Sequence, residues 1–398
     1  MLNGKSVLLI SIITFCRSLF AGEIGTEFTG VTETTKYYFF NERQEIVSDH
    51  IDALQALNLQ VELNYQSPSI NGRILGKARS AIDRSVSSRT GFDWKQLFLM
   101  LETENFDFRI GKIVEHWGVM ESRNLVDIIN PLDGFENYYN KEKVAQNTVK
   151  IGYLLPNSQV DIYVFSGFTP TEFYQHSNRL QAFDFSRSEY EVNQKMGIKD
   201  YAIRASFYYG DFEFALSSFE GTNRTPTIIE SNHQWVAAYN KASQLGVDAT
   251  LVDNKWLYKF EAVCQKGDGV DDDFVSSTIG AEYLLTRILS HADLSVVLEY
   301  FFDDKQKNSS LVSLNDHLFF AARIEMNNLY LSNVLAAIDY DLNHMNSYIF
   351  SLQGDIGLSD KIRTTISVLL DRSESRTAID TNPYQKDFVR LAVEYVLN

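Results

Sequence analysis

The sequence predicts an all-β protein: a single transmembrane antiparallel up-and-down β-barrel of about 18 strands (16–18), with an inward-folded third outer loop. Three observations predict this class. Apolar and polar residues alternate along most of the 398-residue chain. Short and long connections follow each other in turn. Aromatic residues are abundant, with 27 Phe and 21 Tyr, and this load excludes a disordered chain.

The N-terminus has the layout of a secretory signal peptide. Lys5 precedes the apolar run Val7–Phe15, and small residues follow near Ala21. The run is too short to cross a bilayer as a helix, which takes about 20 residues. We therefore expect residues 1–21 to be a signal peptide and residues 22–398 to form the outer-membrane barrel.

Strict alternation is clearest in Leu57–Tyr65, where every second residue is Leu or Val and the residues between them are polar. A period of two indicates a β-strand with one apolar and one polar face. Segments of this kind recur along the chain, each about 9–13 residues long, which is close to the length of a tilted strand that crosses a membrane. The predicted strands are 23–33, 54–65, 71–80, 94–103, 105–115, 147–155, 158–167, 199–209, 211–220, 245–253, 255–265, 275–286, 292–302, 315–326, 328–340, 346–356, 360–371 and 387–397.

The connections between these segments differ systematically in length. Tight turns rich in Asn, Asp, Gly and Pro, such as 155–158, alternate with long polar connections, such as 34–53, 116–146, 168–198 and 221–244. All six prolines fall in predicted turns or loops, as expected when every interior strand amide is used in a closed ladder. Long loops at one end and short turns at the other are typical of outer-membrane barrels.

The two faces of each strand predict two different environments. In a lipid-facing barrel the apolar faces point outward and the polar faces line the lumen. A soluble β-protein would instead pack the same apolar faces in a dry core, and the local pattern is alike in both. On the barrel reading, the pore lining comprises Lys77, Arg79, Arg109, Lys150, Asp161, Arg204, Lys259, Glu261, Glu299, Arg323, Glu325, Arg363, Arg390 and Glu394.

The chain is acidic, with a formal net charge of −16. The polar faces carry nearly equal numbers of bases and acids, so the acidic excess lies mainly in the outer loops, as in Asp268–Asp273. These acids either form a solvated surface or bind divalent cations that bridge to lipopolysaccharide phosphates. An acidic surface does not suit nucleic acid, whose phosphates need a basic one. We expect outer-membrane lipid, lipopolysaccharide, the barrel-assembly machinery and a small polar solute as partners, and no cofactor.

The connection 116–146 contains an apolar stretch, Leu125–Ile129, which is unusual for a segment exposed to water. An inward fold against the barrel wall would bury this stretch. Trp117 would then anchor the loop to the wall, and Gly118 and Pro131 would set its bends. The predicted constriction residues in and beside this loop are Glu115, His116, Glu121, Arg123, Asp127, Asp133 and Glu136.

Two stretches around this loop carry a family resemblance. RIGKIVEHWG (109–118), followed by INPLD (129–133), resembles a motif of porin-like outer-membrane families of Gram-negative bacteria, including uncharacterised barrels related to alginate-export channels. Residues 244–263 are similar to a hairpin of such families. The resemblance implies a porin-like channel for small polar solutes or ions, constricted by loop 116–146. Many such barrels end in Phe, whereas this chain ends in Asn398.

Two other functions fit a barrel of this kind. The first is a surface or structural protein, such as an adhesin. The second is a barrel hydrolase, which would need Ser, His and an acid in mutual reach. Most of the seven histidines lie singly in predicted loops or turns, and the sequence contains neither Gly-x-Ser-x-Gly nor His-Glu-x-x-His. We therefore expect a channel without enzymatic activity.

Overall fold

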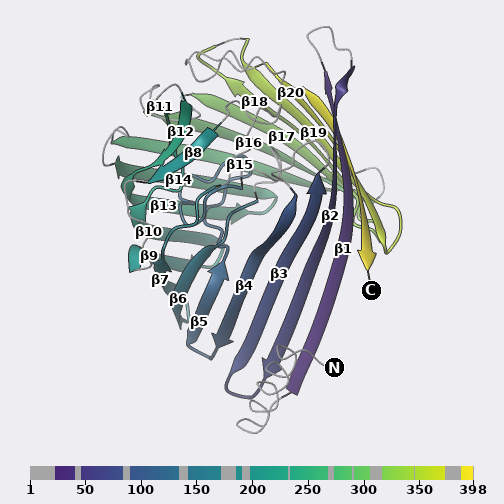
Figure 1. Ribbon diagram of the computed structural model, residues 1–398. Helices are drawn as coiled ribbons and strands as arrows, with labels where there is room; N and C mark the ends of the chain where they lie inside the picture. The colour runs from purple at the N-terminus through teal and green to yellow at the C-terminus, as the bar shows by residue number, and fades with distance from the viewer. Residues whose placement is uncertain are drawn as a thin grey trace.

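Eighteen antiparallel strands form a closed β-barrel in the computed structural model, and a three-stranded sheet lies at one end of it (Figure 1). The predicted fold class is confirmed. The structure describes residues 23–40, 46–83, 90–133, 142–171, 185–190, 198–231, 234–267, 273–288, 291–304, 316–344, 346–372 and 387–397.

The barrel strands follow each other around the wall in chain order. Their bounds are β1 Glu23–Phe40, β2 Ile46–Gln66, β3 Asn71–Asp83, β4 Gly91–Glu102, β5 Phe106–Ile113, β6 Gln146–Leu155, β7 Ser158–Ser166, β9 Ile198–Tyr209, β10 Phe212–Thr222, β13 Lys241–Asp253, β14 Trp256–Gly267, β15 Phe274–Ile288, β16 Ala292–Asp303, β17 His317–Glu325, β18 Asn333–Asp341, β19 Tyr348–Gly357, β20 Ile362–Asp371 and β21 Phe388–Leu397. The small sheet consists of β8 Phe185–Tyr190, β11 Thr227–Ser231 and β12 Gln234–Tyr239.

The first and last strands close the barrel. β1 pairs with β21 from Gly30 opposite Leu397 to Phe39 opposite Phe388, and its other edge pairs with β2. In Figure 1 the purple β1 lies beside the yellow β21. Each barrel strand therefore has a neighbour on both sides, so the ladder uses the backbone N–H and C=O groups and leaves no open sheet edge.

The connections differ between the two ends of the barrel. At one end, which we call the long-loop end, long connections join β5 to β6, β7 to β9 and β10 to β13. The opposite end has short turns, such as Asn254–Lys255 between β13 and β14, where Asn254 adopts φ 54°. Asn tolerates this left-handed conformation better than most residues. No helix within the described ranges is long and apolar enough to span a membrane.

Strand alternation gives the barrel an apolar outer face and a polar inner face. In β14, Lys259 and Glu261 are buried, whereas Tyr258 and Phe260 are exposed. The neighbouring strands continue the outer face with exposed Leu245 and other large apolar side chains. The apolar side chains that a dry core would enclose therefore lie on the outside of this protein.

The predicted long connection 34–53 is wrong at both of its ends. β1 continues to Phe40 and β2 begins at Ile46, so only a short connection remains between them. Tyr37 explains the extension of β1, because it is 1% exposed and packs inside the barrel against Phe388 and Leu369. The consecutive polar residues at 34–36 broke the apolar alternation on which the sequence prediction relied.

The sequence prediction also missed the small sheet. β11 pairs antiparallel with β12, and β12 pairs in parallel with β8, within the connections predicted at 168–198 and 221–244. These strands are only five or six residues long. Periodicity over so few residues does not separate a strand from a loop.

Candidate functional site

All fourteen residues predicted as pore lining lie on the inward faces of their strands. Twelve of them surround the lumen along the wall, while Glu325 and Arg363 lie at exposed positions near the short turns. Glu261 and Glu299 are fully buried, at 0% exposure, because a loop covers them from inside the barrel. The fourteen residues therefore lie inside the barrel, and their contact with a solute stays a prediction.

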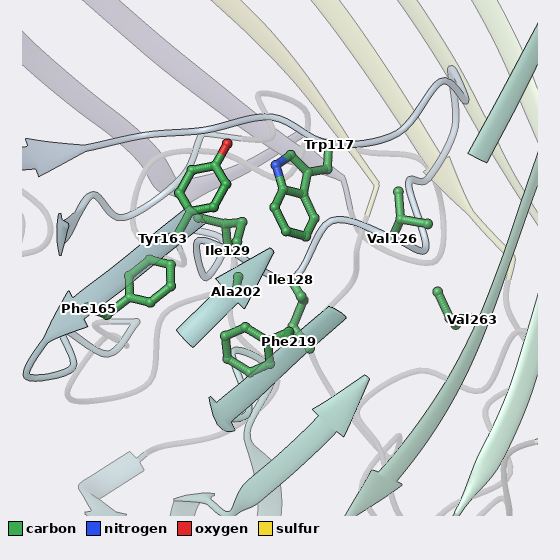
Figure 2. Packing of buried hydrophobic residues seen from close by; sticks show 9 residues of the cluster. All are labelled: Trp117, Val126, Ile128, Ile129, Tyr163, Phe165, Ala202, Phe219 and Val263. Atoms are coloured by element: carbon green, nitrogen blue, oxygen red, sulfur yellow. The ribbon is translucent and has the colours of Figure 1, made fainter. Parts of the chain in front are cut away.

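That loop joins β5 to β6, and we call it L3 (residues 114–145, of which 114–133 and 142–145 are described). L3 lies against the inner wall, as its apolar stretch predicts. Figure 2 shows Trp117 and Val126 of L3 together with side chains of the wall. The buried cluster consists of Trp117, Val126, Ile128 and Ile129 from L3, and Tyr163, Phe165, Ala202, Phe219 and Val263 from β7, β9, β10 and β14.

Two wall carboxylates hold the backbone of L3. Glu261 accepts hydrogen bonds from the N–H groups of Val119 (2.7 Å), Met120 (3.3 Å), Leu125 (2.6 Å) and Val126 (3.2 Å). A carboxylate that accepts backbone N–H groups forms charge-assisted bonds, which are stronger than neutral ones. These bonds satisfy loop amides that would otherwise be buried without partners.

Glu299 holds the neighbouring part of L3 in the same way. It accepts from the N–H groups of Glu121 at 2.7 Å and Ser122 at 3.0 Å, and from the Ser122 hydroxyl. Arg323 of β17 forms an ion pair with the Glu121 carboxylate. Together the two carboxylates fix the segment 119–126 to the β14–β16 part of the wall.

Gly118 makes the sharp bend into this segment. Its φ of 98° lies in the region that favours glycine. A Cβ at this position would lie 2.6 Å from both the Asn124 Oδ1 and the Glu261 Oε1. A side chain here would therefore displace the carboxylate that holds the loop.

Asn130 closes the base of L3. Its side-chain amide donates to the carbonyl groups of Ile113 and Val144, both at 3.0 Å, and its Oδ1 accepts from the Glu115 N–H at 2.9 Å. One side chain thereby joins the outgoing and returning strands of the loop. Pro131 follows it, and its carbonyl accepts from the Val144 N–H at 2.8 Å.

Two of the predicted constriction residues form ion pairs at the sides of L3. Asp133 lies 2.8 Å from Lys95 of β4. Asp127 pairs with Lys143 from the returning part of the loop. Burial raises the pKa of the Asp127 carboxyl, and the Lys143 ammonium opposes this effect.

Glu115 belongs to a third charged group, beneath L3. Arg109 lies 3.0 Å from Asp107 and 3.2 Å from Glu115, and Lys150 lies 3.3 Å from Asp107 and 3.4 Å from Asp161. Burial raises the pKa of the Glu115 carboxyl, while Lys150 and Arg109 oppose this effect. These charges satisfy each other across β5, β6 and β7, which leaves little of them for a solute.

A cavity of about 590 Å³ remains on the other side of the lumen, between L3 and the wall of β1–β4 and β21. Polar groups such as Asn58 and Gln60 contribute to its lining. Its titratable lining residues are Glu33, Tyr37, Lys77, Arg79, Lys95, His116, Glu142, Lys143, Arg390 and Glu394. Glu33 lies between two guanidinium groups, 3.5 Å from Arg79 and 3.3 Å from Arg390.

The seven predicted constriction residues are therefore not gathered at one opening. His116 lines the cavity, whereas Glu115, Glu121, Asp127 and Asp133 hold L3 in place. The remaining two are Arg123, which is exposed, and Glu136, which lies outside the described residues.

Sequence reasoning missed Glu33, Lys95, Glu142 and Lys143 as lining residues of the cavity. Glu33 lies on the polar face of β1 but at the very end of the predicted strand. Within the part of the chain that the structure describes, no group of His, Cys, Asp and Glu is arranged to hold a metal ion. Most of the acidic run Asp268–Asp273 lies outside that part, with only Asp273 described.

No family model and no curated protein matches this chain. Solved structures do share its fold. The BenF-like porin from Pseudomonas fluorescens Pf-5 has a TM-score of 0.55 at 10% identity, over 94% of this chain and 98% of that one. Acinetobacter baumannii OccAB3 has a TM-score of 0.51 at 10% identity, over 94% and 99%. Pseudomonas aeruginosa OpdO has a TM-score of 0.53 at 8% identity, over 93% and 97%. The chain thus has a porin fold.

Proposed function

We propose that this protein is an outer-membrane channel through which small polar solutes diffuse, and that L3 narrows its lumen. The observation that carries the proposal is the one-sided position of L3. The loop packs on the wall of β7, β9, β10 and β14, and a polar cavity remains between the loop and the opposite wall. A loop that plugged the barrel would leave no such space.

The size and faces of the barrel support this function. A barrel of 16–18 strands encloses an aqueous channel unless something fills it. The exposed outer side chains are large and apolar, as in Leu216, Leu245 and Ile279. This surface suits the hydrocarbon core of a membrane, and the polar inner face suits water. The location in the outer membrane follows from the same pair of faces.

The residues of the predicted constriction have two roles in this proposal. His116 faces the solute, together with Lys77, Arg79 and Arg390 of the opposite wall. Glu115, Glu121, Asp127 and Asp133 act indirectly, because they hold L3 at a fixed distance from that wall. The constriction is then a gap between a loop and a wall rather than a ring of loop carboxylates.

The charges around the cavity favour anionic solutes. Its lining has five lysine or arginine residues and three glutamates, although the chain as a whole is acidic. Lys95 and Lys143 are paired with Asp133 and Asp127, so the preference rests on the wall of β1–β3 and β21, where three bases face two carboxylates. A narrow passage with cationic walls lowers the barrier for anions and raises it for cations.

Planar-bilayer recording of the folded protein tests the function. We expect discrete conductance steps, and under a salt gradient a reversal potential that indicates a preference for chloride over potassium. A bilayer that stays silent after insertion of verified folded protein would overturn the channel. A surface or structural role would then explain the barrel better.

We also propose that residues 1–21 are removed on export and that residues 22–398 form the mature barrel. The charged, apolar and small-residue sequence of this segment supports removal. The intact mass of protein purified from outer membranes tests it, because a retained N-terminus would contradict the cleavage. Outer-membrane lipid, lipopolysaccharide and the barrel-assembly machinery are proposed partners, because an outer-membrane barrel is exported, assembled and embedded among them.

The relation to alginate-export channels is a finer proposal. It is supported by the stretches 109–118 and 129–133, whose residues have definite tasks in L3. Gly118 makes the bend beside Glu261, and Asn130 joins the two ends of the loop. Uptake or efflux of a uronate oligosaccharide by vesicles containing the protein tests the relation, and no transport above empty vesicles would contradict it.

A further inference from the structure

Arg224 is a buried cation at the long-loop end, in the connection between β10 and β11. Its Nη1 lies 2.6 Å from the Asp200 carboxylate of β9 and donates to the Thr222 carbonyl at 2.9 Å. Asp200 also accepts from the Thr222 N–H at 3.1 Å. A buried ion pair recovers its desolvation cost only when its geometry is good and further hydrogen bonds satisfy both partners. The Asp200 carboxylate and the Arg224 Nη1 meet these conditions, whereas the buried Arg224 Nη2 has no hydrogen-bond partner among the described residues.

The same guanidinium reaches into L3. Its Nε donates to the Ile129 carbonyl at 3.0 Å. Ile129 is 1% exposed and directly precedes Asn130, which joins the two ends of L3. A charge-assisted bond to a buried carbonyl belongs to the stronger class of hydrogen bonds. Arg224 therefore links the wall, its own connection and L3 in one contact.

Three phenylalanine rings surround this guanidinium. Its central carbon lies 5.1 Å from the Phe165 ring centroid and 5.0 Å from those of Phe168 and Phe219. Cations at this distance are attracted to the ring faces, more strongly where water is excluded. Phe168 belongs to the connection that leads from β7 to β8, and its ring packs 5.0 Å from that of Tyr239 at the end of β12.

A second contact ties the same connection to L3. The Thr171 hydroxyl donates to the Leu132 carbonyl at 2.7 Å. Thr169 and Gln146 exchange two further hydrogen bonds, at 2.8 and 2.9 Å. The segment 129–132 of L3 is thus held by both connections that carry the small sheet of β8, β11 and β12.

We propose that Arg224 is a positioning residue of the constriction. Through Arg224, the docked position of L3 depends on the two connections that contain the small sheet of β8, β11 and β12. This inference rests on the proposed channel function. Arg224 keeps the passage open because it holds L3 on the wall. When the bond to Ile129 breaks, the segment 126–132 of L3 loosens from the wall and moves toward the cavity, while Glu261 and Glu299 still hold the segment 119–126. Displacement of the small sheet would then change conduction through the cavity, although the sheet itself does not line the cavity within the described part of the chain.

The test compares Arg224→Lys with a control pair at the same end of the barrel. Lysine keeps the charge beside Asp200 but lacks the second donor that reaches Ile129. We expect channel closures about tenfold more frequent or more, as the loss of one charged hydrogen bond implies. Arg372→Gln removes the bonds from Arg372 to Asp387, both 2.7 Å and away from L3, and leaves the closure frequency unchanged.

Hydrogen exchange gives a readout that does not need conduction. In Arg224→Lys the amides of residues 126–132 exchange faster by about the same factor, while the strand amides of β14 keep their protection. Thr171→Val, which is nearly isosteric, keeps the pair with Asp200 and produces a smaller increase in the same segment. This second variant applies if Arg224→Lys does not fold.

The outcomes separate the two proposals. Equal exchange of residues 126–132 in wild type and both variants overturns the role of Arg224, whatever the bilayers show. A wild-type protein that fails to conduct, with faster exchange in the variants, overturns the channel and leaves the positioning role standing. An equal rise in closures in Arg372→Gln also overturns the inference, because the effect would then be general.

Discussion

The ammonium group of Lys77 faces the cavity, and within the described ranges it forms no hydrogen bond or ion pair. Its charge is therefore available to a passing solute. We expect Lys77→Glu to move the reversal potential toward cation preference, because the substitution changes the lining by two charge units. A salt-gradient recording in planar bilayers measures this shift.

Lys36→Glu is the matched control for this prediction. It makes the same charge change on an exposed side chain of β1, two residues beyond Thr34 on the outward face. We expect no shift of reversal potential for this variant. Equal shifts in Lys77→Glu and Lys36→Glu would mean that net charge, rather than the cavity, sets the preference.

His116 gives the cavity a dependence on pH. Burial lowers the pKa of its imidazole, the Lys143 ammonium lowers it further, and Asp127 opposes both effects. A base with a lowered pKa is neutral at neutral pH and gains its positive charge only at more acidic pH than an ordinary histidine. We therefore expect anion preference to increase as the pH falls below the usual histidine range. His116→Asn removes this step, and an unchanged step in that variant would contradict the assignment.

Single residues also mark what the sequence can and cannot predict of the site. Lys77, Glu261 and Glu299 were placed inside the barrel because a period of two fixes the face of every strand residue. The partners of Asp127 and Asp133 were beyond reach, because a loop without regular period brings Lys143 and Lys95 to them through its three-dimensional path. Spacing along the chain carries no signal for such pairs.

At the scale of elements, the central feature is that L3 is held by wall carboxylates rather than by its own secondary structure. Glu261→Gln keeps the size of the side chain and removes the charge that four backbone N–H groups share. Hydrogen bonds to a charged group are stronger than neutral ones, so we expect the substitution to make the free energy of docking of L3 less favourable by about 2 kcal/mol. Hydrogen exchange of residues 119–126 measures this loss as faster exchange.

Glu282→Gln controls for the removal of an inward carboxylate. Glu282 lies on β15 and bonds Lys259 at 3.0 Å. We expect slow exchange of residues 119–126 in this variant, as in the wild type. If both variants loosened L3 to the same extent, the barrel interior as a whole would be responsible, and the specific role of Glu261 would be refuted.

Some elements can be predicted from the sequence and others cannot. Long strands such as β13 and β14 have enough alternating residues to be recognised, and a two-residue turn joins them. The ends of β1 and β2 were missed because interior packing of Tyr37, and not periodicity, extends β1. The parallel pair of β8 and β12 joins segments far apart in the sequence, and no local pattern announces such a pairing.

The whole molecule separates two environments, one on each face of the barrel wall. The strands carry apolar side chains outward, where exposed Phe28, Leu245 and Ile279 lie, and polar side chains inward. Closure of β1 on β21 completes this separation around the full circumference. The inward position of L3 fits this separation, because Glu261 and Glu299 on the inner wall accept hydrogen bonds from the loop amides.

Thiol accessibility along β2 tests this separation most directly. In a Cys264→Ser background, single cysteines replace Asn58, Leu59, Gln60 and Val61 in turn, and the folded protein is placed in lipid vesicles. We predict that a charged, water-soluble thiol reagent modifies the cysteines at 58 and 60, on the inward face of β2, and spares those at 59 and 61, on its outward face. Modification of the cysteines at 59 and 61 instead, or of all four at equal rates, would contradict this assignment of an apolar outer face and a polar inner face.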